Sequence, residues 1–104
     1  VHTGPYASRC LASGGDFLDA GLAGEFEKVQ AAGAAIRDAG MRFNAGHALN
    51  YYNVQPVARL SGIRELHIGH AIVSRSVFVG LREAVREMKQ LMREAANLPE
   101  VRGE

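Results

Sequence analysis

The chain has 104 residues, of which 47% are hydrophobic and 22% are charged, a composition typical of one small globular domain. Its formal net charge is +1 with acidic and basic residues interspersed, so it lacks the basic stripe that binds nucleic acid. No apolar run approaches the roughly 18 residues that span a bilayer, and no leader pattern opens the sequence. We therefore expect a cytoplasmic protein with no membrane contact.

The opening residues, Val-His-Thr-Gly-Pro, have the pattern of a strand that ends in a turn. Because they do not begin with methionine, we interpret the chain as a truncated part of a longer protein. The single cysteine, Cys10, has no second cysteine for a disulfide, a redox pair or a thiolate metal site. We interpret it as an unreactive thiol.

Residues 7–19 mix small and polar side chains without clear periodicity and contain Gly14 and Gly15, so we predict a loop there. From Leu22 to Ile36 apolar residues recur at spacings of three and four, which predicts an amphipathic helix. Gly40 then supplies its C-terminal stop.

Two short strands are predicted in the second half of the chain, over residues 41–45 and 63–68, because apolar and polar side chains alternate in both. Between them, Asn53 is placed to cap a short helix that has Pro56 in its first turn and ends near Leu60.

An apolar segment, 71–79, follows the second strand and is interrupted at Gly80. The final helix has an apolar stripe from Leu81 to Ala95, and Pro99 and a polar tail follow it. Strands that alternate with helices predict an α/β fold built of parallel β-α units. Two strands can neither close a barrel nor cover both faces of their helices, so we expect partner elements outside this chain.

The strongest functional signal is that both predicted strands end in a glycine-histidine pair, Gly46-His47 and Gly69-His70. These pairs would meet at the carboxyl edge of a parallel sheet, where α/β proteins place their active sites. His47 is a candidate general acid or base, and the alternative is a hydrogen-bonded structural histidine. Gly69, with a helix starting near His70, suits phosphate binding, and His70 has the same structural alternative.

The sequence does not favour a metal site or a nucleotide-binding site. The four histidines show no spacing that groups three ligands, so we predict no metal, and the P-loop and dinucleotide-binding motifs are absent. In a barrel, the polar faces of the two strands would point into the lumen. We therefore predict that Arg42 and Glu65 form an ion pair there, because an unpaired buried charge costs about 3–5 kcal/mol.

Three segments together resemble pyridoxine 5'-phosphate synthase: Asn-Ala-Gly-His at 44–47, Asn-Val at 53–54 and Glu-Leu-His-Ile-Gly-His-Ala-Ile at 65–72. The opening His-Thr-Gly and the final helix agree with it. The resemblance covers essentially the whole chain and is weakest over residues 7–40. It implies the C-terminal β-α units of a (β/α)8 TIM barrel, incomplete in this chain, with residues 1–104 as part of one domain whose N-terminal portion is missing.

The resemblance also implies a reaction. The family condenses 3-amino-2-oxopropyl phosphate with 1-deoxy-D-xylulose 5-phosphate to give pyridoxine 5'-phosphate, phosphate and water, with no metal or organic cofactor, and a homo-oligomer is implied. His47 matches the family's proton donor, Ala48 matches a substrate-contacting position, and Gly69 and His70 match the pair that holds substrate phosphate.

Two positions depart from the family pattern, since Ala48 replaces a usual glycine and His67 stands where asparagine is common. The family's other acid-base histidine and glutamate lie on earlier strands, so we expect the 104 residues alone to be inactive. The alternative is a stand-alone half-barrel that binds a phosphorylated small molecule or completes a barrel by self-assembly.

Overall fold

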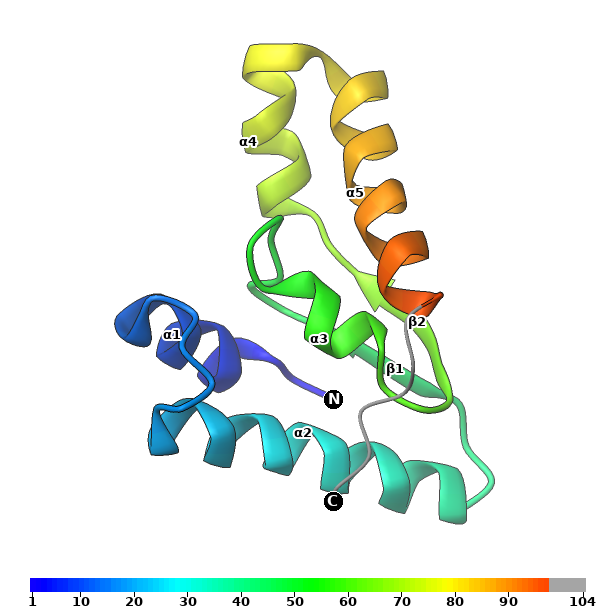
Figure 1. The fold of residues 1–104 in the computed structure, drawn as a ribbon. Helices are drawn as coiled ribbons and strands as arrows, with labels where there is room; N and C mark the ends of the chain where they lie inside the picture. The colour runs from blue at the N-terminus through cyan, green and yellow to red at the C-terminus, as the bar shows by residue number, and fades with distance from the viewer. Residues whose placement is uncertain (98–104) are drawn as a thin grey trace.

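A computed structural model describes residues 1–97 of the chain. Five helices and two strands follow one another along it (Figure 1). In chain order they are α1 (Gly4–Ser13), α2 (Ala20–Asp38), β1 (Phe43–Gly46), α3 (Val54–Ala58), β2 (Ile63–His67), α4 (His70–Val79) and α5 (Leu81–Ala96). The strands, the helix over 22–36 and the final helix are confirmed, and the apolar segment 71–79 is α4. The predicted stop at Pro99 lies outside the described residues.

The sheet is small and parallel. β1 pairs with β2 so that Ala45 lies opposite Leu66 and Gly46 opposite His67. The opening residues join the other side of β1, where His2 forms a parallel bridge with Gly46 and the Gly46 N–H donates to the Val1 carbonyl at 3.1 Å. β1 is therefore flanked on both sides by parallel segments, and the α/β prediction is confirmed at this level.

The loop predicted over residues 7–19 is wrong in its first half, because α1 occupies Gly4–Ser13. Pro5 stands in the first turn, where its missing N–H has no helical partner to lose. The side chains of Tyr6 and Cys10, four residues apart, are buried on one face. Gly14 ends the helix in the left-handed conformation with φ 67°. The glycines at 14 and 15 and the mixed small and polar side chains before them favour a loop, and this signal hid the helix.

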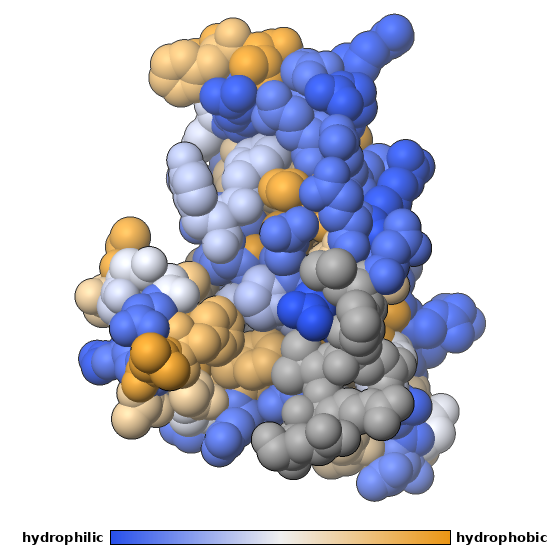
Figure 2. Space-filling model, in the orientation of Figure 1, coloured by the Kyte–Doolittle hydropathy of each residue, from blue (hydrophilic) through white to orange (hydrophobic). Residues whose placement is uncertain are grey.

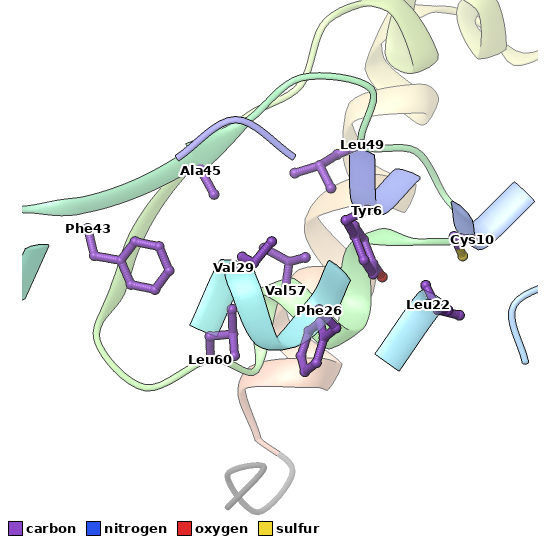
Figure 3. Packing of buried hydrophobic residues seen from close by; sticks show 10 residues of the cluster. All are labelled: Tyr6, Cys10, Leu22, Phe26, Val29, Phe43, Ala45, Leu49, Val57 and Leu60. Carbon is purple, nitrogen blue, oxygen red and sulfur yellow. The ribbon is translucent and has the colours of Figure 1, made fainter. Parts of the chain in front are cut away.

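The core forms where α1, α2 and α3 pack against one face of β1 (Figure 3). Phe43 and Ala45 point into it from the strand, and both are only 2% exposed. A side-chain carbon at Gly33 of α2 would overlap the Phe43 ring, so this glycine lets helix and strand approach closely. The Cys10 thiol also lies in this core, and burial raises its pKa, as suits an unreactive cysteine.

α4 and α5 form a hairpin that extends away from the sheet (Figure 1). Arg75 of α4 and Glu87 of α5 tie the two helices together through an ion pair at 3.0 Å. α5 buries Ala84, Met88 and Ala95, whereas α4 has no buried residue. The side chains of Val77 and Phe78 are 79% and 82% exposed, and hydrophobic residues gather at the tip of the hairpin (Figure 2).

No helix within residues 1–97 has both the length and the apolar character that crossing a bilayer requires.

Candidate functional site

The carboxyl ends of β1 and β2 open onto one cavity of about 490 Å³. All four residues that the sequence singled out line it: His47 and Ala48 after β1, and Gly69 and His70 after β2. They come together because the strands are parallel and in register, so that Gly46 lies beside His67 and the segments that follow leave the same edge. Each of the four is exposed to solvent in this chain.

The segment that leaves β1 has an unusual backbone. His47 and Ala48 have φ values of 94° and 61°, the positive-φ residues other than glycine within the described chain. Side chains disfavour this left-handed region, and residues held there cluster at active sites. The Thr3 hydroxyl donates to the His47 carbonyl at 2.7 Å, and the Asn53 side-chain amide donates to the Ala48 carbonyl at 3.1 Å.

The predicted cap at Asn53 is correct in position and wrong in contact. Asn53 is the residue before α3, yet its side chain makes no capping hydrogen bond to that helix. Its side-chain oxygen instead accepts from the Asn50 N–H at 2.7 Å, and its amide reaches Ala48. Asn53 therefore supports the backbone of the cavity wall at Ala48 instead of capping α3 with its side chain.

A second imidazole lies against His47. The rings of His2 and His47 stack with their centroids 4.1 Å apart, and His2 Nδ1 accepts from the Gly4 N–H at 3.2 Å. A side-chain carbon at Gly4 would lie 2.5 Å from the His2 ring and 3.1 Å from the His47 ring. Glycine at this position therefore leaves room for the stack. The two histidines are 45 positions apart, so no local sequence pattern connects them.

The turn after β2 leads directly into α4. Gly69 is the residue before the helix and His70 is its first residue, so the unpaired N–H groups of the first turn lie at the edge of the cavity. Such N–H groups and the positive end of the helix dipole favour an anion. A protonated His70 would add to this preference.

The predicted Arg42–Glu65 ion pair is wrong. Arg42 precedes β1 and is exposed, and no ion pair within the described chain joins it to Glu65. Asn44 takes the place opposite Glu65 and donates to its carboxylate at 3.1 Å, while His67 Nε2 lies 3.5 Å from the same oxygen. The Glu65 and His67 side chains are about two-thirds exposed, so water screens their attraction.

Within residues 1–97, no three histidine, cysteine or carboxylate side chains come close enough together to hold a metal ion.

The fold and cavity define an α/β protein in which parallel strands bring two glycine-histidine turns to one sheet edge. The family described as pyridoxal phosphate biosynthesis protein PdxJ matches residues 1–94, so the chain belongs to this family.

The curated relatives that the chain matches are also similar to it over most of its length. The chain is 69% identical over 98 residues to the pyridoxine 5'-phosphate synthase of Aromatoleum aromaticum, an alignment that covers 94% of this chain and 39% of the relative. It is 70% identical over 96 residues to the synthase of Dechloromonas aromatica, covering 92% of this chain and 38% of the relative. For the synthase of Rhodopirellula baltica the identity is 55% over 92 residues, covering 88% and 34%. The chain thus spans less than two-fifths of the length of these relatives.

Proposed function

We propose that residues 1–104 are the C-terminal part of a (β/α)8 barrel and that the whole protein is a pyridoxine 5'-phosphate synthase, a transferase. The carrying observation is the cavity that gathers His47, Ala48, Gly69 and His70 at the carboxyl edge of parallel strands, in a chain of this family. In barrel enzymes, this edge carries the chemistry and the last loops commonly bind phosphate. The substrates are 3-amino-2-oxopropyl phosphate and 1-deoxy-D-xylulose 5-phosphate, which condense to pyridoxine 5'-phosphate, phosphate and water without a metal or organic cofactor.

The roles follow from position. The N–H groups at Gly69 and the start of α4 hold a substrate phosphate together with His70, because an anion is favoured at a helix N-terminus. His47 donates a proton to an oxygen that leaves as water, since a hydroxyl departs readily only when protonated. Ala48 contacts substrate through its backbone, so its methyl group is compatible with this role if the left-handed conformation is kept.

The uncovered surface of α4 and the open edges of the sheet support the proposal that further β-α units belong to the whole protein. α4 has no buried residue, and the outer edges of the small sheet have no strand partner within the described chain. Open strand edges and exposed apolar side chains are costly in a protein that stands alone. Earlier β-α units would cover them and supply the further acid-base residues.

We also propose that the whole protein is a cytoplasmic homo-oligomer whose partners are phosphorylated small molecules, not nucleic acid or membrane.

The test compares synthase activity of the 104-residue chain with that of the protein extended by its upstream coding sequence. The proposal expects activity in the extended protein alone, with His47→Ala abolishing it. An upstream frame without further β-α units would contradict the barrel proposal, and an inactive extended protein would contradict the reaction.

One observation favours the half-barrel alternative: ten buried residues already form a core within this chain. It predicts a soluble, defined oligomer of the 104 residues that binds inorganic phosphate. Sedimentation and phosphate titration of that chain would distinguish the two proposals, because the fragment proposal expects aggregation through the open edges.

A further inference from the structure

Two buried polar side chains meet the backbone on consecutive residues of the cavity wall. Thr3 and Asn53 are only 0% and 3% exposed, and they are the buried polar residues within the described chain. The Thr3 hydroxyl donates to the carbonyl of His47, and the Asn53 amide donates to the carbonyl of Ala48.

The residues they hold are the two with left-handed backbones. An alanine or histidine left to itself returns to negative φ, so a left-handed pair persists only when its surroundings impose it. Reversal of either φ would redirect the peptide groups around residue 48 and swing the His47 ring away from the cavity. The two hydrogen bonds oppose this change because each fixes the direction of one carbonyl.

Both donors are themselves fixed. The Thr3 N–H donates to the Gly46 carbonyl at 2.8 Å, and the Thr3 carbonyl accepts from the Ala7 N–H at 2.9 Å, so Thr3 is held between β1 and α1. The Asn53 carbonyl accepts from the Tyr6 hydroxyl at 2.7 Å in the core. Asn53 thus connects the cavity wall to the same helix, α1.

We propose that Thr3 and Asn53 are positioning residues: they hold the His47–Ala48 backbone left-handed and thereby aim the His47 ring and the Ala48 backbone at the substrate. The catalytic part of this inference rests on the proposed function. Its structural part, the dependence of the two φ angles on these donors, stands without it.

The variants separate donation from size. Thr3→Val removes the hydroxyl at nearly constant volume, and Thr3→Ser keeps it. Asn53→Asp keeps the oxygen that accepts from the Asn50 N–H but loses the donor to Ala48. Each is made in the extended protein, and kcat, KM and the φ angles in a crystal structure are measured.

We expect Thr3→Val and Asn53→Asp to lower kcat/KM about 10- to 100-fold, mostly through kcat, because a misplaced proton donor weakens the transition state more than the bound state. The kcat/KM of Thr3→Ser should stay within about threefold of the parent value, because serine keeps the hydroxyl that donates to His47. Adding Ala48→Gly to Asn53→Asp should recover at least about threefold, because glycine adopts positive φ without a holding contact.

A purely structural role for these donors gives a different result. Ala48→Gly would then recover nothing, and the crystal structures would keep both φ angles positive, which would overturn the proposal. If Asn53→Asp fails to fold, the Thr3→Val and Thr3→Ser pair decides. An extended protein without synthase activity would contradict the proposed function, while the φ angles of the variants would still test the holding contacts.

Discussion

The imidazoles of His2 and His47 stack with their centroids 4.1 Å apart and their planes inclined by 27°. The stack joins the opening segment of the chain to the residue that follows β1. The His2 ring packs against one face of the His47 ring, the proposed proton donor. The Thr3 hydroxyl donates to the His47 carbonyl at 2.7 Å. The opening segment beside β1 therefore contacts the site through His47.

We expect His2→Ala to lower kcat of the extended protein by about tenfold at most, because an aromatic pair contributes about 0.5–1.5 kcal/mol. His2→Phe keeps a ring beside His47 and should retain most of the activity. Steady-state kinetics of both variants provide the measurement. Equal losses in the two would show that an imidazole nitrogen of His2, not its stacked ring, is needed.

Gly33→Ala should destabilise the protein by about 1–3 kcal/mol, because the new methyl group overlaps the Phe43 ring in a filled core. Gly24→Ala is the matched control in the same helix, where the added carbon meets no atom within 4 Å. It should stabilise the protein by about 0.5–1 kcal/mol through helix propensity. Denaturant unfolding would measure both, and similar signs would contradict the packing of α2 on β1.

Tyr6→Phe should cost about 1–3 kcal/mol, because it leaves the buried Asn53 carbonyl without its donor. Burial raises the pKa of Tyr6, so the phenol remains a donor throughout the neutral range. Tyr52→Phe is the control. Tyr52 is 94% exposed, so removal of its hydroxyl should leave the free energy of unfolding unchanged. Equal effects of the two changes would argue against the Tyr6 contact.

Asp19 should make stability pH-dependent. The Arg9 side chain hydrogen-bonds to its carboxylate and the Leu22 N–H donates to it, and both lower the pKa of Asp19. A carboxyl whose pKa is lower in the folded state stabilises the fold above its unfolded pKa and loses this contribution as pH falls through the folded pKa. Asp19→Asn should therefore lower the thermal midpoint at pH 7.

The same difference should shrink as pH falls below about 4, the ordinary pKa of an Asp carboxyl in an unfolded chain, and should go on shrinking through the lower pKa of Asp19 in the folded state. Asn keeps an acceptor for the Leu22 N–H but loses one of the two oxygens that accept from Arg9, so the pH dependence of the difference, and not its size at pH 7, reports the charge. A difference in thermal midpoint that stayed constant from pH 7 to pH 3 would contradict the assigned role of the charge.

The elements that could be predicted are those encoded by residues close together in the sequence. The strands, α2 and α5 follow from residues whose spacing matches one regular structure. His47, Gly69 and His70 follow from the glycine-histidine pairs at two strand ends, and Ala48 from the family resemblance. α1 was missed because Gly14, Gly15 and the mixed small and polar side chains of residues 7–19 favour a loop, although Tyr6, Ala7 and Cys10 are buried in the helix. The Arg42–Glu65 pair failed because β1 begins one residue after Arg42 and its polar face presents Asn44 to Glu65.

The sequence by itself determined the α/β class, the family resemblance and the two turns at which chemistry is proposed, because each depends on neighbours within a few positions. Only the tertiary structure decided how those turns are supported. The contacts of Thr3 with His47, Tyr6 with Asn53 and His2 with His47 join residues 44 to 47 positions apart. Such pairs form because packing α1 beside β1 brings their groups within hydrogen-bonding or stacking distance, and local spacing carries no record of that geometry.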